Sequence, residues 1–127
     1  MELKVLTTLG DLDAAIAGSA TRPLLLFKHS LTCGTSAYAR EEVDVVCADG
    51  GLPVDACVVH VQTGRALCSA IADRFGIRHE SPQLLLISNG QVVWHASHFR
   101  ITRHDITAAV ERHLASALAE ATPAGAP

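Results

Sequence analysis

The sequence predicts a single α/β domain with a central mixed sheet and helices on both faces. Short apolar segments typical of strands alternate along the chain with segments whose apolar residues have helical spacing. One apolar segment, Pro23 to His29, has the continuous pattern of a strand that is buried on both faces. Two further strand-like segments are joined at Asn89–Gly90, which is a strong hairpin signal, so the sheet also gains antiparallel strands.

The first strand and helix lie at the N-terminal end of the chain. Leu3 to Leu6 is a short strand candidate. Thr8 stands three residues before Asp11, which is the spacing of a capping box, and this box opens a helix that continues through Ala17. Gly18 marks the end of that helix.

Two more strand–helix pairs follow. The strand at 23–29 precedes a helix at 35–48, whose apolar residues recur at helical spacing and which the sequence DGG at 49–51 ends. The next strand is at 56–61. The helix after it has an apolar stripe at i, i+4 and i+8 and ends at a glycine; these residues are Leu67, Ile71, Phe75 and Gly76.

The C-terminal part of the chain contains the hairpin and one more helix. Thr102 and Asp105 again have capping-box spacing. The helix that they open has an apolar face, which consists of Ile106, Val110, Leu114 and Leu118. We expect one domain over residues 1–121 and a flexible tail over 122–127, where small residues and proline predominate.

The resulting order, β-α-β-α-β-α-β-β-α, is that of the thioredoxin fold, so residues 1–121 are expected to form a thioredoxin-like domain. In this architecture the loop after the central strand presents a cysteine at the N-terminus of the next helix, and Cys33 stands at that place. Unpaired backbone N–H groups and the helix dipole favour an anion there. We therefore expect the Cys33 thiol to have a lowered pKa and to react as a thiolate.

Pro82 is the second mark of this fold. It stands directly ahead of a strand, where its missing N–H costs no ladder hydrogen bond. Thioredoxin-like proteins hold such a proline in the cis form beside the cysteine. Cys33 and Pro82 together, in the right order of elements, are a more specific signal than either residue alone.

Composition limits the partners and the cellular location that can be expected of this protein. Hydrophobic residues make up 49% of the chain and charged residues 18%, with a net charge of -3, so neither disorder nor a basic nucleic-acid face is expected. The N-terminal sequence does not resemble a signal segment, and no apolar run approaches the ~18 residues of a membrane span. We expect a cytoplasmic protein with no nucleic-acid or membrane partner.

Three further cysteines accompany the one at the helix start. Cys57 lies in an apolar strand segment and Cys68 on a helix with apolar neighbours, so both are expected to pack in the core, whereas Cys47 falls near a helix end. Their spacing lacks the close pairs of a zinc site, and His95 and His98 have no third ligand nearby in sequence. No metal site is expected, and the thiols are expected to be reduced.

Three segments carry a family resemblance: FKHSLTCGTS at 27–36, ADRFGIRHESPQLLLISNGQVVWHASH at 72–98, and the IT that follows at 101–102. They strongly resemble the monothiol bacilliredoxins of the YtxJ type, which are thioredoxin-fold proteins of the bacillithiol redox system. The resemblance implies that Cys33 is the active cysteine and that Pro82 is the cis-proline. It also implies that Ser36 stands where a dithiol relative would have its resolving cysteine.

The resemblance implies a thiol–disulfide oxidoreductase that removes bacillithiol from mixed disulfides on cytosolic proteins. Ionised Cys33 would attack the bacillithiol sulfur, and a second small thiol would then resolve the adduct. Bacillithiol is then a co-substrate, bacillithiolated client proteins are the partners, and no bound cofactor is implied. The residues expected to support Cys33 are Thr32, Gly34, Thr35 and Ser36, and those expected to form the substrate groove are Ser81 and Pro82.

Two polar groups near Cys33 have alternative interpretations. The hydroxyl of Ser36 either donates a hydrogen bond to the thiolate or caps the helix. Lys28 and His29 end the central strand, where either cation would stabilise the thiolate, but a solvated strand end is the preferred interpretation.

The segment just before Pro82 has a related interpretation. His79 and Glu80 precede the proline in the part of the chain expected beside the active cysteine. They are interpreted as residues that line the binding groove and have no catalytic role.

Two other classes of function remain open. The sequence departs from the bacilliredoxins at Gly34 and Thr35, where members of that family more often have other residues, and CGTS resembles the CGFS loop of monothiol glutaredoxins. In that case Cys33 from two chains and two small thiols would hold an iron–sulfur cluster. The remaining alternative is a redox-inert thioredoxin-fold binding module.

Overall fold

The computed structural model describes residues 3–48 and 51–121. Five strands form one sheet in the order β1-β3-β2-β4-β5. The elements are β1 (Lys4–Val5), α1 (Leu9–Gly18), β2 (Leu24–His29), α2 (Gly34–Val46), β3 (Asp55–His60), α3 (Arg65–Phe75), β4 (Gln83–Ser88), β5 (Gln91–Ser97), the 3-10 turn η1 (His98–Arg100) and α4 (Arg103–Ala121). The expected order of strands and helices is confirmed.

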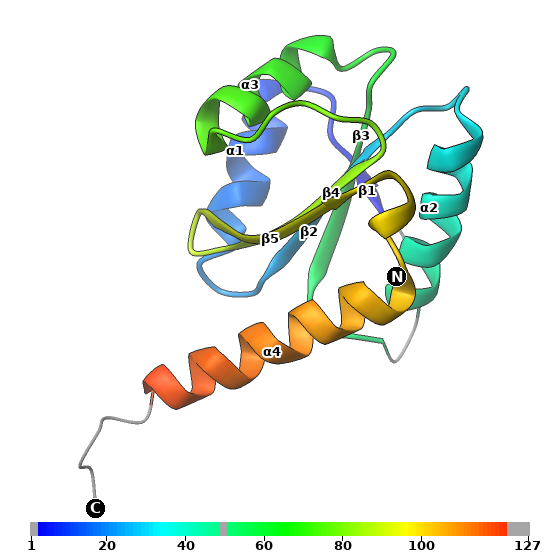
Figure 1. The fold of residues 1–127 in the computed structure, drawn as a ribbon. Coiled ribbons are helices and arrows are strands. Elements are labelled where there is room, and N and C mark those ends of the chain that lie inside the picture. The colour runs from blue at the N-terminus through cyan, green and yellow to red at the C-terminus, as the bar shows by residue number, and fades with distance from the viewer. Residues whose placement is uncertain (1–2, 49–50, 122–127) are drawn as a thin grey trace, which may run out of the picture.

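The sheet is mixed, and β2 is its central strand. β1 and β2 both run parallel to β3, whereas β4 is antiparallel to both β2 and β5. The helices cover both faces of the sheet, with α1 and α3 on one face and α2 and α4 on the other (Figure 1). The predicted α/β class, with a mixed sheet between helices, is therefore confirmed.

The side chains of β2 alternate between two apolar cores. Leu24 and Leu26 pack with residues of α1 and α3, whereas Leu25 and Phe27 pack with residues of α2 and α4. All four side chains are at most 3% exposed. Because both faces of this strand are covered, its sequence is apolar throughout instead of alternating with polar residues.

The helix ends follow the local sequence signals. At α1 the backbone N–H of Asp11 donates to Oγ1 of Thr8 (3.0 Å), and the backbone N–H of Thr8 donates back to the Asp11 carboxylate (3.2 Å). This is the expected capping box. α3 ends at Gly76, whose φ of 64° is in the left-handed region that glycine adopts most readily.

The predicted hairpin is present between β4 and β5. Asn89 has a φ of 51° and Gly90 a φ of 74°. Positive φ at both central residues is the requirement of the two-residue turn that suits the twist of antiparallel strands. The hairpin therefore places β5 at one edge of the sheet, beyond β4.

The last helix differs in part from the expectation. Ile106 and Val110 are fully buried, but Leu118 is 70% exposed. α4 extends past the sheet toward its C-terminal end (Figure 1), so its last turns lie beyond the apolar core. The expected tail at 122–127 and the first two residues of the expected break at 49–51 lie outside the described residues.

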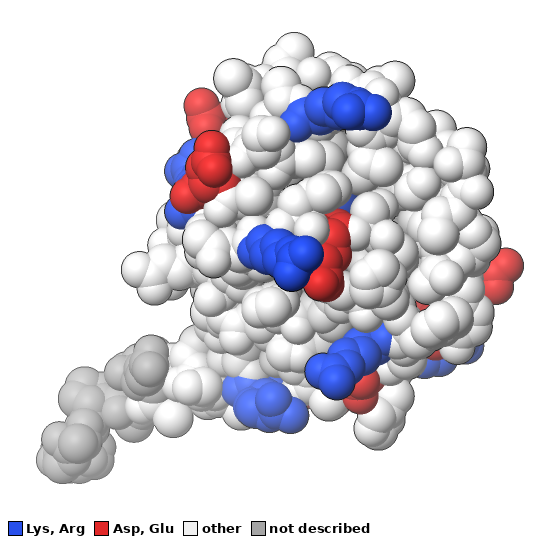
Figure 2. Space-filling view, turned by 45° about the horizontal axis from the view of Figure 1, so that its top comes forward, with Lys and Arg blue, Asp and Glu red and all other residues white. Residues whose placement is uncertain are grey.

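The charged surface agrees with the modest net charge. On the face drawn in Figure 2, acidic and basic side chains lie singly or in small mixed groups, with wide uncharged areas between them. Within the part of the chain that the structure describes, no helix is long and apolar enough to span a membrane.

Candidate functional site

Cys33 lies where the loop from the central strand β2 turns into α2. It is the N-cap residue of this helix, with extended backbone angles of φ −105° and ψ 126°. Its carbonyl accepts a helical hydrogen bond from the backbone N–H of Ala37 at 3.0 Å. The side chain is partly exposed, while the other three cysteines are buried. The expected position of Cys33 at a helix N-terminus is confirmed.

Backbone donors of the first helical turn lower the pKa of the Cys33 thiol. The largest contribution is a hydrogen bond from the backbone N–H of Ser36, followed by one from the backbone N–H of Thr35. The Thr35 side chain adds a smaller contribution in the same direction, and partial burial opposes all three. A thiolate thus accepts hydrogen bonds from N–H groups that the start of a helix leaves unpaired.

The hydroxyl of Ser36 has partners other than those expected. Ser36 is fully buried, and its Oγ accepts a hydrogen bond from the backbone N–H of Ser30 at 2.9 Å. The same oxygen lies 2.7 Å from Nδ1 of His29, and α2 has no side-chain cap. Both predicted roles of this hydroxyl, as donor to the thiolate and as helix cap, are therefore wrong. The backbone of Ser36, not its side chain, reaches the sulfur of Cys33.

The last two residues of β2 are buried, so the prediction of a solvated strand end is wrong. Lys28 is 0% exposed and His29 is 7% exposed. Because neighbouring strand residues point to opposite faces, His29 faces α2 and stacks on Phe27, with 5.3 Å between the ring centroids. Lys28 lies on the α3 side, where its Nζ is 3.1 Å from Nδ1 of His79.

The surroundings of His29 favour its neutral form. Burial lowers its pKa most, the charges of Arg40 and His60 lower it further, and Asp44 opposes them. A neutral ring can either accept from or donate to the Ser36 hydroxyl through Nδ1. His29 therefore holds the first turn of α2 through Ser36, and its lowered pKa disfavours the cation that would stabilise the thiolate.

Gln62, which no sequence pattern indicates, holds the loop before Cys33. Its Oε1 accepts a hydrogen bond from the backbone N–H of Leu31 at 3.2 Å. Its Nε2 donates to Oγ of Ser30 at 2.9 Å and to Oγ1 of Thr32 at 3.2 Å. This is where the structure places Thr32, one of the predicted support residues. Gln62 follows β3 by two residues, and no local pattern indicates that its amide meets a loop some thirty residues earlier.

Gly34 is the first residue of α2, and its surroundings are open. A Cβ built at this position would meet no atom within 4 Å, and its φ is not positive. Neither a close approach nor the backbone angle therefore requires glycine here.

Ser81 and Pro82 lie at the same end of the sheet as the Cys33 loop. β4 begins at Gln83, which pairs with Lys28 near the end of β2, so Pro82 stands just beyond the last residues of the central strand. The Ser81–Pro82 peptide bond is cis. The carbonyl of Pro82 accepts a hydrogen bond from the backbone N–H of His98 at 3.0 Å, and the buried Ser81 Oγ has no partner among the described residues.

The remaining three cysteines are buried in the two apolar cores. Cys47 follows the last residue of α2, so the length of the helix, about 20 Å, separates it from Cys33. Cys57 lies in β3, where burial raises the pKa of its thiol to about 12. Cys68 lies on α3, and both Cys57 and Cys68 pack in the core under α1 and α3, as predicted.

The histidines after β4 do not form a metal centre. Within residues 3–48 and 51–121, no group of three or more His, Cys, Asp or Glu side chains is placed to hold a metal ion. His95 and His98 are exposed. The hydroxyl of Ser97 donates a hydrogen bond to Glu80 and is the main cause of a lowered Glu80 pKa.

A mixed five-stranded sheet with this topology, together with a helix-capping cysteine of lowered pKa, defines a thiol oxidoreductase of the thioredoxin fold. The family model described as "Monothiol bacilliredoxin BrxC" matches residues 4–106. The chain therefore belongs to the monothiol bacilliredoxin family.

Solved structures support the fold assignment. A protein with a thioredoxin fold, which its own description assigns provisionally as an oxidoreductase, is 27% identical, with a TM-score of 0.77 over 84% of this chain and 92% of that one. Fasciola hepatica thioredoxin is 19% identical, with a TM-score of 0.72 over 87% of this chain and 99% of its own. Trypanosoma brucei brucei thioredoxin has a TM-score of 0.74 at 7% identity, over 89% of this chain and 91% of its own. The predicted thioredoxin fold is confirmed.

Proposed function

We propose that this protein is a cytoplasmic oxidoreductase that removes bacillithiol from mixed disulfides on client proteins, with Cys33 as its only nucleophile. One observation carries the proposal. Cys33 is partly exposed at the N-terminus of α2 with a lowered thiol pKa, while the residue that would hold a resolving cysteine is Ser36. A single reactive sulfur needs a small thiol as its second reactant.

The reaction proceeds by two thiol–disulfide exchanges. The Cys33 thiolate attacks the bacillithiol sulfur of the client's mixed disulfide, so that a Cys33–bacillithiol disulfide forms and the client sulfur leaves as a thiolate and takes up a proton. A second bacillithiol, as its thiolate, then attacks the bacillithiol sulfur of this adduct. Bacillithiol disulfide forms, and Cys33 leaves as the thiolate. The net reaction consumes one reduced bacillithiol for each client that is released, and the other half of the bacillithiol disulfide comes from the mixed disulfide on the client.

The segment ahead of β4 supplies a place for the extended part of a substrate. Ser81 lies outside the ladder that joins β4 to its neighbours, and its backbone forms no hydrogen bond within the described part of the chain. Free backbone groups at a strand end can pair with an extended peptide or a peptide-like small thiol. Ser81 and Pro82 are therefore proposed as the substrate groove.

Exposed apolar side chains near the site provide contact area for a protein client. Leu31, in the loop before Cys33, is 60% exposed, and Phe99 in η1 is 71% exposed. The ring of Phe99 lies 6.4 Å from that of Tyr38 on α2, which is itself 46% exposed. Apolar side chains of this kind, next to a reactive sulfur, suit a protein partner.

Intact mass spectrometry tests the proposal. The reduced protein is exposed to bacillithiol disulfide, and in a second sample to oxidised glutathione, and the mass added per chain is measured. One bacillithiol adduct at Cys33, removed when reduced bacillithiol is added, is the expected result. Cys33→Ser should gain no adduct, whereas the matched control Cys47→Ser, which removes a buried cysteine, should behave as the unaltered chain.

Two results would contradict the proposal. A protein that acquires only glutathione would have a different small-thiol partner. A visible absorption band of an iron–sulfur cluster after anaerobic purification, lost in Cys33→Ser, would instead identify a cluster carrier like the monothiol glutaredoxins.

A further inference from the structure

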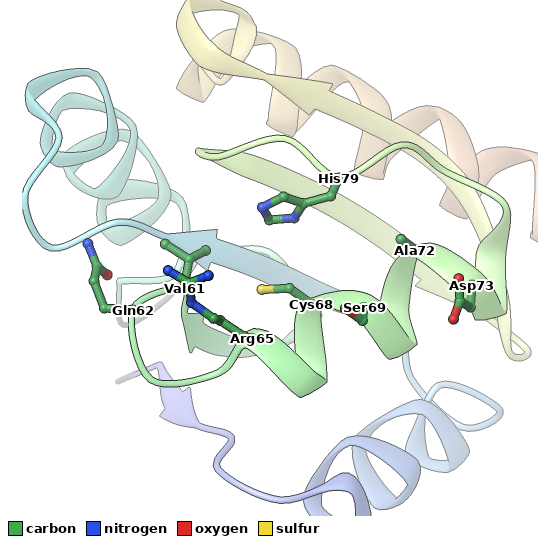
Figure 3. Close-up of a pocket in the computed structure, with 8 residues that line it drawn as sticks. All are labelled: Val61, Gln62, Arg65, Cys68, Ser69, Ala72, Asp73 and His79. Atoms are coloured by element: carbon green, nitrogen blue, oxygen red, sulfur yellow. The ribbon is translucent and has the colours of Figure 1, made fainter.

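A pocket of about 760 Å³ opens beside α3, on the face of the sheet opposite α2. Figure 3 shows its walls, which come from the segment after β3, from α3 and from the segment that leads to β4. The residues that line it are Val61, Gln62, Arg65, Cys68, Ser69, Ala72, Asp73 and His79. None of the reactions described above uses this pocket.

Lys28 lies behind the pocket wall as a buried amine without a carboxylate partner. Its side chain is 0% exposed, and its one hydrogen bond joins Nζ to Nδ1 of His79 at 3.1 Å. No Asp or Glu of the described residues lies within ion-pair distance of Nζ. Burial lowers the pKa of Lys28, and the charges of Cys68 and Glu80 partly oppose this effect. A buried ammonium without an anion is costly, so a bound anion would stabilise it.

The hydrogen bond to Lys28 also decides where the proton of His79 lies. An ammonium can only donate, so Nδ1 of His79 accepts, and the neutral ring carries its hydrogen on Nε2. Burial, and then the charge of Lys28, lower the pKa of His79 and favour this neutral form. Figure 3 shows the ring turned into the pocket, where it can offer an N–H donor.

The other charges of the pocket are unevenly placed. Arg65 lines the end of the pocket next to Val61 and Gln62, and it forms no ion pair within the described part of the chain. Asp73 lies at the opposite end in Figure 3. The end that holds Arg65 therefore favours an anion, and it is the end nearest the active-site loop.

A second polar atom next to Lys28 also lacks a partner. Gln83 pairs with Lys28 across the two strands, so both side chains leave the sheet on the same face. Gln83 is 1% exposed, and its Oε1 has no hydrogen bond among the described residues, whereas its Nε2 donates to the carbonyl of Arg78 at 3.1 Å. A buried acceptor of this kind is normally satisfied, so the polar groups around Lys28 are incompletely paired within the described part of the chain.

Gln62 joins this pocket to the site of the chemistry. Its side chain lines the pocket and also holds Leu31 and Thr32 of the Cys33 loop. A ligand in the pocket thus lies one side chain away from the loop that carries the reactive sulfur. Cys68, in contrast, is no second nucleophile, because burial raises the pKa of its thiol more than the nearby Lys28 lowers it.

We propose that this pocket binds the carboxylate-bearing part of the small thiol, with Arg65 as the cation and His79 as the N–H donor that contact it, and with the buried Lys28 acting from behind His79. The proposal rests on the proposed function, since it assigns the non-reacting end of that reaction's small thiol to a place beside the Cys33 loop. Arg65 and His79 then bind the end of the substrate that does not react, and Lys28 is a positioning residue that acts through its hydrogen bond to Nδ1 of His79 and through its charge.

The test compares disulfides that differ in charge. The rate at which Cys33 reacts is measured with bacillithiol disulfide and with oxidised glutathione, which carry carboxylates, and with hydroxyethyl disulfide, which carries no charge. Lys28→Met should slow the reaction with bacillithiol disulfide about tenfold, because it removes both the charge behind the pocket and the charged hydrogen bond that holds Nδ1 of His79 as an acceptor. It should leave the rates with hydroxyethyl disulfide and iodoacetamide unchanged. Equal slowing with oxidised glutathione would show that the pocket recognises carboxylates of either small thiol.

Two further variants control for a loss of folding in Lys28→Met and for a general effect of surface charge. Arg65→Gln changes an exposed residue at the pocket mouth that cannot compromise the core, and it should slow the charged disulfides alone. Arg112→Gln removes an equally exposed cation from α4, on the other face of the sheet, and should change nothing. Unchanged rates with bacillithiol disulfide in both pocket variants would overturn the proposal. Slowing of the neutral disulfide to the same extent would also overturn it, because Lys28 would then act on Cys33 itself.

A binding measurement separates this proposal from the proposed function. Succinate, a dicarboxylate without sulfur, is titrated into Cys33→Ser while amide resonances are followed by NMR. Saturable shifts confined to α3 and the segment around His79 would support the pocket, provided that they are lost in the double variant Cys33→Ser with Lys28→Met. This support would hold even if bacillithiol disulfide fails to react with the unaltered protein. Absence of such shifts, together with normal reaction of bacillithiol disulfide, would reject the pocket alone.

Discussion

The reactivity of Cys33 depends on backbone donors more than on any neighbouring charged side chain. The N–H groups of Ser36 and Thr35 reach the sulfur, while the side chains of Lys28 and His29 in the preceding strand are turned to opposite faces of the sheet. Backbone donors of a helix start are fixed by the helix itself. The lowered thiol pKa is therefore a property of the N-cap position and does not require a particular side chain at position 36.

The pH dependence of alkylation at Cys33 follows from this geometry. The thiolate is favoured in the folded state, so the rate of iodoacetamide labelling should reach half its maximum at a lower pH in folded protein than in protein unfolded in urea, where about 8.5 is expected. By the same linkage, stability gained from the thiolate is present above the unfolded pKa and is lost as the pH falls through the folded pKa. Equal midpoints in the two states would contradict the role of the helix donors.

Replacement of Ser36 by alanine separates stability from reactivity. Ser36→Ala leaves the N–H of Ser30 and Nδ1 of His29 without their buried partner, so the free energy of unfolding should fall by about 1–3 kcal/mol. The backbone N–H at position 36 remains, so the pH midpoint of Cys33 labelling should stay where it is. Denaturant unfolding and labelling measure the two effects, and Ser116→Ala on the exposed face of α4 serves as the control. A large rise in the midpoint would restore the hydroxyl as the donor.

Among the elements, the strand ends were harder to predict than the strands. Apolar periodicity identified β2 and its burial, and Thr8, Asn89 and Gly76 marked ends and turns through their local chemistry. Whether Lys28 and His29 are exposed depends on which elements cover the end of the strand, and this is decided by the register with β4 and by α2 and α3. Such partners are distant in sequence, so no local pattern contains them.

Gly76, which ends α3, tests how much one positive φ angle contributes to the free energy of unfolding. Gly76→Ala should lower the free energy of unfolding by about 1 kcal/mol, because alanine is strained at a φ of 64° although its Cβ would meet no atom. Gly18→Ala is the matched control, since its Cβ would also meet no atom and its φ is not positive. That variant should be neutral or stabilised by up to about 1 kcal/mol. Similar losses in both variants, measured by denaturant unfolding, would show that the backbone angle is not the cause.

At the scale of the whole molecule, the fold separates the partly exposed Cys33 from three buried cysteines. Cys47 is at the far end of α2, and Cys57 and Cys68 lie in the core on the side of α1 and α3. The sequence correctly indicated the burial of Cys57 and Cys68 and the position of Cys33. It did not indicate Gln62 or the pocket, because both arise where β3, α3 and the β2 loop meet in space.

This separation predicts the products of oxidation. After treatment with bacillithiol disulfide, peptide mapping should find one mixed disulfide at Cys33 and three free thiols, since a disulfide needs Cα atoms within about 7 Å. Digestion under native and denaturing conditions should give the same map. A major product with a bond from Cys33 to Cys47, Cys57 or Cys68 would mean that the protein works as a dithiol enzyme after a large rearrangement.

The strand order has a consequence for how the sheet meets other chains. One edge is β1, which has only two residues, and the other is β5, whose pairing with β4 is interrupted by a bulge near Leu86 and Ile87. Short and irregular edges are poor templates for a foreign strand, which protects a sheet against edge-to-edge aggregation. An unfolded or extended client therefore has little opportunity to extend the sheet sideways. It is directed to the end of the sheet, where the reactive sulfur is.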